Sequence, residues 1–158
     1  MKRRYARWAL VPMFIMFSTG VRAEPHHLDT YLAAIDLPLS AELTLSVCDD
    51  TSVLLPITLD ANRSLYVRAR ALAAYSMIAN EDGVDVLTLV AGSDLPASIR
   101  LQAAISLSQV FGPRLPNLTI SRLIELMPRL SDWSSMVHRF IEEISQAQRV
   151  AEDVNDVK

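Results

Sequence analysis

The chain has 158 residues, of which 51% are hydrophobic and 21% are charged, and its formal net charge at pH 7 is −3. This length and apolar fraction predict one domain that buries a real core. The single cysteine, Cys48, excludes an intrachain disulfide, so we expect packing alone to stabilise the fold. Cys48 itself is expected to be a small buried side chain, with an intermolecular bridge as the alternative.

The first 23 residues have the pattern of a secretory signal peptide. Basic residues at positions 2, 3, 4 and 7 precede an apolar run from Trp8 to Phe17, and Ala23 ends a short segment suited to signal peptidase. The run is shorter than the roughly 20 residues of a membrane span. We therefore expect cleavage after Ala23 and export to the periplasm or the medium, with no stable membrane span afterwards. An uncleaved anchor is the alternative.

The charge of the chain changes when residues 1–23 are set aside. They hold five of the 15 basic residues and none of the 18 acidic ones, so the rest carries 10 − 18 = −8. An acidic surface binds nucleic acid and anionic lipid poorly. We expect no nucleic-acid partner, and a protein partner with a basic surface is favoured.

From residue 24 onward the apolar residues recur at helical spacing. Residues 24–50 are expected to form an N-terminal segment with short helices, although a brief strand at 43–47 is an alternative for part of it. Residues 51–149 are expected to form the main domain, and residues 150–158 a frayed acidic tail. Ser40, Asp50 and Ser64 are expected to cap helices. The expected helices are 28–35, 40–47, 51–60, 64–79, 82–91, 95–111, 117–129 and 132–149.

One motif recurs along this helical region. It consists of a polar residue, four further residues, a β-branched residue and then a basic residue, and it spans 62–68, 94–100 and 132–138. The third copy is weaker, because His138 stands where the others have Arg68 and Arg100. An amphipathic helix precedes each copy, and small residues follow the first two. Such self-similarity predicts an array of antiparallel helix pairs.

The pattern D-x4-[VI]-R followed by Ala resembles the HEAT repeat, particularly the HEAT-like repeats found in phycobilisome lyases, over about residues 50–148. The resemblance implies an all-α fold, a short α-solenoid of about three antiparallel helix pairs. It also implies a ladder of Asp–Arg contacts between neighbouring repeats, which by position falls on Asp94, Arg68 and Arg100. Asn62 and His138 depart from the pattern, which indicates end-capping repeats.

The physical chemistry of arginine agrees with this structural role. Its long apolar stem packs between helices while its five-donor head satisfies carbonyl groups or an aspartate. Anion capture at a helix N-terminus is the functional alternative for Arg68 and Arg100.

Three other residues are candidates for contact with a partner. Arg70 has no counterpart in the second copy and turns away from Arg68, so we expect it to face a partner. Trp133 shares a helix face with Met136 and Phe140, which favours core packing and leaves partner binding as the alternative. His138 is either a pH-sensitive latch or a simple replacement of arginine.

No recognised catalytic, phosphate-binding or metal-binding motif occurs in the chain. We therefore expect no cofactor, no metal and no enzymatic activity. The predicted function is that of an exported interaction or scaffold module, which binds a protein partner through the groove lined by the second helices. An enzyme or enzyme subunit related to HEAT-like lyases is one alternative, and a purely structural exported domain is another. The pattern does not indicate the partner or the oligomeric state.

Overall fold

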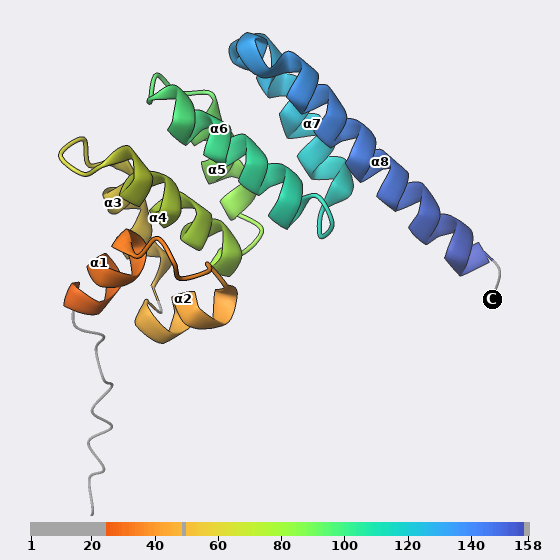
Figure 1. Cartoon of the computed structure of the whole chain (residues 1–158). Helices are drawn as coiled ribbons and strands as arrows, with labels where there is room; N and C mark the ends of the chain where they lie inside the picture. Colours follow the sequence, from red (N-terminus) through yellow and green to blue (C-terminus); the bar gives the residue numbers. More distant parts are fainter. Residues whose placement is uncertain (1–24, 49, 157–158) are drawn as a thin grey trace, which may run out of the picture.

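The computed structural model describes residues 25–48 and 50–156, and every regular element in these ranges is a helix (Figure 1). The predicted signal segment and its cleavage point after Ala23 lie outside the described residues. The all-α class is confirmed, and the strand considered at 43–47 is wrong. The elements are α1 (Pro25–Ala33), α2 (Ala41–Val47), α3 (Thr51–Leu59), α4 (Leu65–Ile78), α5 (Gly83–Ala91), α6 (Ala97–Ser106), η1 (Leu107–Phe111), α7 (Pro116–Leu126), η2 (Met127–Trp133) and α8 (Ser134–Asp156).

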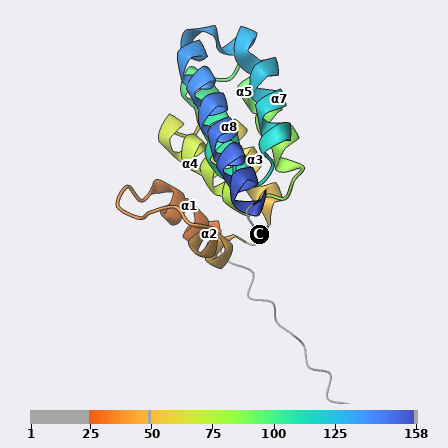
Figure 2. The same ribbon diagram turned by 90° about the vertical axis from the view of Figure 1, so that its right-hand side faces the viewer.

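Consecutive helices pack as pairs, α3 with α4, α5 with α6 and α7 with α8, and the pairs lie side by side (Figure 1). Between neighbouring pairs α4 packs on α6 and α5 on α7, while α1 and α2 both lie against α4. In the view of Figure 2, α3, α5 and α7 lie on the right of the stack and α4 on the left, with α8 in front. The first helices of the pairs therefore form one layer and the second helices another.

Small residues let α4 and α6 approach each other closely. Ala71 and Ala74 on α4 and Ala103 and Ala104 on α6 are fully buried. Two helix backbones can lie closer together when alanine rather than leucine stands between them. Larger apolar side chains fill the surrounding core. Those with no exposed surface include Leu54, Leu72, Leu87, Ile99, Leu107, Phe111 and Leu123.

Three predicted caps fix the starts of helices. Ser40, Asp50 and Ser64 each accept a hydrogen bond from a backbone N–H in the first turn of α2, α3 and α4. The hydroxyl and the backbone N–H of Ser52 both donate to Asp50 and lower the pKa of its carboxyl group. These helix starts agree with the sequence because capping acts within a single turn of chain.

The second half of the chain departs from the expected boundaries. The helix expected over 95–111 becomes α6 and then the π-helical turn η1, and a 3-10 segment, η2, joins α7 to α8. The helix α8 continues to Asp156, so the frayed tail expected over 150–158 is helical through that residue. A hydrogen bond of 3.2 Å from Gln148 Nε2 to Glu152 Oε1, one turn apart, supports this extension.

Burial of Tyr75 predicts a stability change in alkali. Burial, and secondarily the negative charge of Asp82, raises the pKa of the Tyr75 phenol. The folded protein therefore favours the neutral phenol. That contribution is complete below the ordinary tyrosine pKa of about 10 and is lost as pH rises through the raised value. We expect urea denaturation to show a fall in unfolding free energy above about pH 10, and a shallower fall in Tyr75→Phe. Equal slopes for the two proteins would contradict this expectation.

Candidate functional site

Arg68 joins the two helices of the first pair. Its side chain, on α4, is 5% exposed, and its Nε donates a 2.8 Å hydrogen bond to the carbonyl oxygen of Thr58 in the last turn of α3. The final carbonyls of a helix lack partners in the helix and carry a partial negative charge. Arg68 satisfies one of them with a charged donor, so it holds the end of α3 against α4.

Arg100 and Arg129 make related contacts between the second and third pairs. Arg129 Nη1 donates a 3.0 Å hydrogen bond to the carbonyl of Gly92 at the end of α5. Nη1 of Arg100, on α6, lies 3.5 Å from the carbonyl oxygen of Arg129, and its guanidinium lies over the ring of Trp133 at 5.4 Å from the centroid. Arginine side chains thus reach backbone carbonyls across helix boundaries at two places in the stack.

The predicted Asp94–Arg ladder is not formed. Asp94 is exposed and, within the ranges that the structure describes, it makes no ion pair and no side-chain hydrogen bond. The physical reason is that α6 begins only at Ala97, so Asp94 precedes the helix, and the guanidinium groups of Arg68 and Arg100 reach carbonyls instead.

The ion pairs between distant parts of the chain involve residues that the sequence analysis did not single out. Arg63, before α4, pairs with Asp29 on α1, and Arg122 on α7 pairs with Asp85 on α5 at 2.7 Å. Neither pair recurs at the repeat distance, and no other feature of the sequence distinguishes these residues from ordinary surface charges.

Arg70 is not the free partner-contacting residue that the sequence predicted. Its guanidinium lies over the rings of Tyr31 and Tyr66, 5.8 and 5.6 Å from their centroids, and Nη2 donates a 2.9 Å hydrogen bond to the carbonyl of Leu37. It therefore fastens α1 and the connection to α2 onto α4. No pattern in the sequence predicts this contact, because the N-terminal segment carries no repeat that would place it against α4.

Replacing Arg70 by alanine is expected to loosen α1 and α2 without unfolding the stack. Losing a charged hydrogen bond and two cation–π contacts should speed amide exchange over residues 28–47 by about tenfold, or about 1.4 kcal/mol. Hydrogen exchange followed by mass spectrometry measures this change. The control is Arg149→Ala, because among the described residues Arg149 bonds only the carbonyl of Ser145 in its own helix, through Nε. Equal protection in the two variants would contradict the assignment.

Trp133 and His138 lie at the other end of the stack. Trp133 and Met136 are half-buried against the core and Phe140 is buried, which agrees with the core-packing interpretation of that face. His138 is exposed, and its Nδ1 lies 2.8 Å from the carbonyl oxygen of Ser134 in its own turn. Within the described residues His138 thus has no side-chain hydrogen bond or ion pair to another helix that protonation would open.

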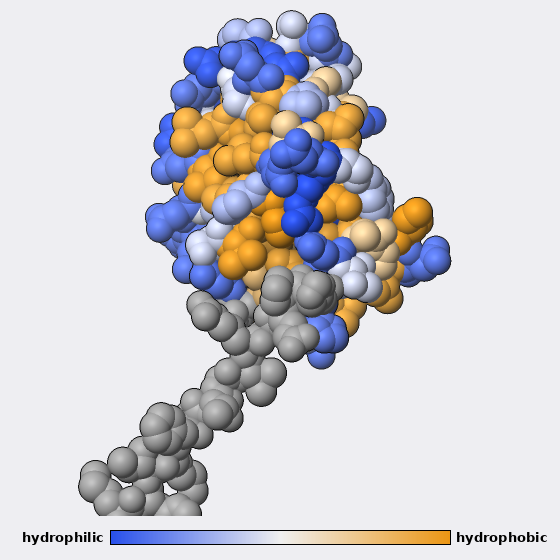
Figure 3. Space-filling view, turned by 90° about the vertical axis from the view of Figure 1, so that its left-hand side faces the viewer, coloured by the Kyte–Doolittle hydropathy of each residue, from blue (hydrophilic) through white to orange (hydrophobic). Residues whose placement is uncertain are grey.

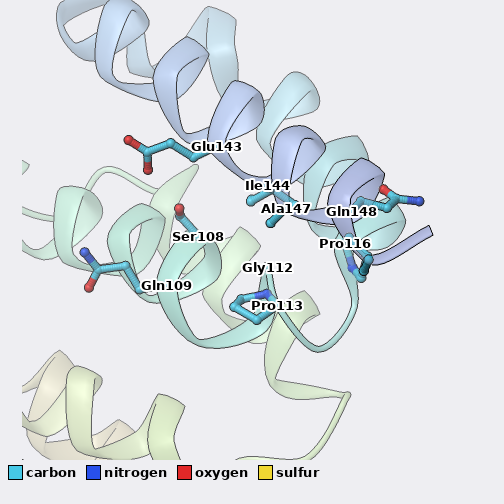
Figure 4. A pocket seen from close by; sticks show the side chains of 10 residues that line it. Ser108, Gln109, Gly112, Pro113, Pro116, Glu143, Ile144, Ala147 and Gln148 are labelled. Carbon is cyan, nitrogen blue, oxygen red and sulfur yellow. The ribbon is translucent and has the colours of Figure 1, made fainter. Parts of the chain in front are cut away.

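A cleft of about 380 Å³ lies between η1, the turn that follows it and α8 (Figure 4). Its volume falls in the range of about 300–1,000 Å³ that is usual for ligand pockets. The cleft separates the second helix of the middle pair from the second helix of the last pair. Its lining residues are Ser108, Gln109, Gly112, Pro113, Pro116, Glu143, Ile144, Ala147, Gln148 and Ala151.

The cleft opens because α8 does not repeat the packing of α4 on α6. It packs on α7 and η2 and meets the middle pair chiefly at η1. Gly112 makes the close approach possible there, because a Cβ at this position would collide with the carbonyl oxygen of Ser108 and lie 2.9 Å from Cδ1 of Ile144. The π-helical turn just before Gly112 makes the helix wider at the same place. Such turns are frequent at functional sites.

The walls of the cleft combine an apolar floor with a few polar groups. Ser108 is 6% exposed, and its hydroxyl has no hydrogen-bond partner among the described residues. Figure 4 shows Ser108 and Glu143 on opposite walls, with the Ser108 hydroxyl directed toward the side of α8. Glu143 is mostly exposed and only loosely paired, at 3.9 Å from Nε of Arg139. The cleft can therefore accept an aliphatic group, a cation and a hydrogen bond together.

Other indicators of function are few. Comparison of the chain with models of protein families, with curated proteins and with solved structures found no match in any of the three. Within residues 25–48 and 50–156, no three His, Cys, Asp or Glu side chains are grouped so that they could hold a metal ion. In the same part of the chain, no helix combines the length and the apolar character needed to cross a membrane.

Proposed function

We propose that the protein is an exported, non-enzymatic interaction module that binds a protein partner through the cleft between η1 and α8. The observation that carries this proposal is the cleft itself, whose walls place the Ser108 hydroxyl opposite the exposed Glu143 side chain. It lies between second helices, which is where the sequence analysis expected the binding groove.

We further propose that the stack is a short HEAT-like α-solenoid. Three successive helix pairs lie side by side, and contacts between pairs join like layers, α4 with α6 and α5 with α7. Arg68 and Arg100, the repeated arginines, both reach backbone carbonyls of other helices. Repeats stacked in this way present long concave surfaces that suit protein partners.

The chemistry of the cleft favours a basic, extended segment of the partner. Glu143 offers a carboxylate to a lysine or arginine, while Ile144 and Ala147 offer an apolar surface to its aliphatic stem. The Ser108 hydroxyl can donate to a backbone carbonyl or accept from a backbone N–H. The charge of −8 expected after residue 23 acts in the same direction, because it attracts basic partners over a longer range.

The composition of the lining supports binding over catalysis. Among the described residues, Glu143 is the one ionisable residue that lines the cleft, so this lining holds neither a pair of carboxylates nor a nucleophile beside a base. Ser108 lacks the adjacent histidine that would activate its hydroxyl.

The proposal is tested by photo-crosslinking in the producing cell. A photoreactive amino acid replaces Gln109 on the cleft wall, and the captured protein and the segment in contact are identified. We expect one partner, held through a segment that carries lysine or arginine, and about tenfold less product when Glu143 is replaced by lysine. The matched control is Glu142→Lys, which changes the same charge on the neighbouring residue outside the lining. Capture of the protein by itself alone, or equal loss in both variants, would contradict the proposal.

A further inference from the structure

The turn between α3 and α4 carries a sequence pattern that neither the packing of the helices nor the cleft uses. Asn62-Arg63-Ser64 matches the acceptor pattern for N-linked glycosylation, which is asparagine, any residue except proline, and then serine or threonine. The same pattern occurs once more, at residues 117–119 in the first turn of α7. The pattern is short, so the surroundings of the two asparagines decide which of them an enzyme can use.

The polar side chains of the first pattern are accessible in the folded protein. Asn62 is exposed, and its carboxamide makes no hydrogen bond among the described residues. Only its backbone N–H is used there, in a 2.9 Å bond to Asp60. The Ser64 hydroxyl is exposed as well, and it accepts one long bond of 3.3 Å from the backbone N–H of Val67. An enzyme can therefore contact both groups while the fold stays intact.

The second pattern is inaccessible in the same fold. Thr119 has no exposed surface, and Oδ1 of Asn117 accepts a 3.3 Å hydrogen bond from Gln148 on α8. Contact with the Thr119 hydroxyl would require the first turn of α7 to unwind and leave the core. The folded protein thus offers the first pattern and withholds the second.

The residue two positions before each asparagine points in the same direction. Asp60 precedes Asn62 at this distance, and several bacterial oligosaccharyltransferases require an acidic residue there. Leu115 stands at the corresponding position before Asn117. The chemistry of the turn therefore suits such an enzyme at Asn62 alone.

We propose that Asn62 is the site of an N-linked glycan, which an oligosaccharyltransferase adds after export. The donor is an oligosaccharide joined to a lipid through a diphosphate. Nδ2 of Asn62 forms a bond to C1 of the first sugar, while the bond from C1 to the diphosphate oxygen breaks and the diphosphate leaves with the electron pair. The amide nitrogen gives one proton to a base of the transferase, so nothing is oxidised or reduced. The inference rests on the export that we propose and not on the cleft.

The position of the turn gives the glycan a physical role. The turn projects from the α3 end of the stack (Figure 1), and the same end has apolar side chains over much of its surface (Figure 3). Leu59, Leu65 and Tyr66, all within four residues of Asn62, are 54%, 49% and 42% exposed. A bulky hydrophilic sugar at Asn62 would cover part of this apolar surface, which is otherwise a liability for aggregation.

The test is mass spectrometry of the protein as purified from its producing cell, intact and after digestion. We expect the peptide that contains Asn62 to carry a mass increase equal to a whole number of sugar residues, with sugar fragment ions in its spectrum. The peptide that contains Asn117 should carry none. Asn62→Gln should abolish the increase, and the matched control Asn117→Gln should leave it unchanged. An unmodified Asn62 in the wild type, or a glycan on Asn117 in its place, would overturn the proposal.

Two variants of Ser64 separate recognition of the hydroxyl from its effect on the fold. Ser64→Ala should abolish the modification, whereas Ser64→Thr keeps both the hydroxyl and the helix cap and should retain it. Loss of the glycan in both variants, with unchanged helical circular dichroism, would contradict the assignment. Glu143→Lys should be modified as fully as the wild type, which separates this proposal from the one for the cleft. A chain that begins at Glu24 but carries no glycan would overturn this proposal and leave the proposed export standing.

Discussion

Replacing Gly112 by alanine is expected to lower the free energy of unfolding by about 3 kcal/mol, the upper end of the usual range for overpacking. The added Cβ would meet the carbonyl oxygen of Ser108 and would lie 2.9 Å from both Cδ1 and Cγ1 of Ile144. A backbone carbonyl in a helical turn cannot rotate aside as the end of a flexible side chain can. Either η1 or α8 must therefore move, and the packing between them is lost.

Urea denaturation of the wild type and Gly112→Ala measures this difference. The control is Gly92→Ala, where the added Cβ would lie 3.0 Å from Nη1 of Arg129 and 3.3 Å from Cδ2 of Leu126. The end of the exposed Arg129 side chain can shift, at the expense of its hydrogen bond to the Gly92 carbonyl, so we expect a cost of only about 1 kcal/mol. Equal losses in the two variants would show that α8 is not held through Gly112.

Replacing Arg68 by methionine is expected to lower the free energy of unfolding by about 2 kcal/mol, within the range for hydrogen bonds to charged groups. Methionine keeps most of the apolar stem but removes the donor, so the Thr58 carbonyl loses its 2.8 Å hydrogen bond in a buried position. Thermal and urea unfolding both measure the loss.

The matched control is Arg100→Met in the second copy of the motif. Arg100 is less buried than Arg68, and its hydrogen bond to Arg129 is long at 3.5 Å. We expect a cost below about 1 kcal/mol, much of it from the contact with Trp133. A larger loss at Arg100 than at Arg68 would contradict the view that the carbonyl contact in the first pair is the stronger brace.

Local patterns predicted the helices well and their partners less well. Helix starts at Ala41, Thr51 and Leu65 agree with the sequence because a cap and the first turn are neighbours in the chain. The repeated motif also identified Arg68 as an internal residue. The acceptor of its hydrogen bond depends on how α4 is rotated and shifted against α3, which no local pattern specifies.

Long-range placement accounts for the two other differences. Arg70 contacts Tyr31 and Leu37, which precede it by more than thirty residues. The sequence pattern of their segment does not indicate that it packs against α4. The cleft depends on the close approach of Gly112 to Ile144. As a result α8 meets the middle pair chiefly at η1 and does not pack along α6 as α4 does. The sequence predicted a groove between second helices but not its position. The local sequence around a glycine in a turn does not show whether another helix packs against that glycine.

The braces formed by Arg68 and Arg129 have a consequence in acid. A carboxylate ordinarily takes up a proton near pH 4, so a ladder of aspartate and arginine would come apart there. The carbonyl groups of Thr58 and Gly92 have no such titration, and arginine stays charged throughout this range. The contacts that join α3 to α4 and α5 to η2 therefore do not depend on the protonation state of any carboxylate.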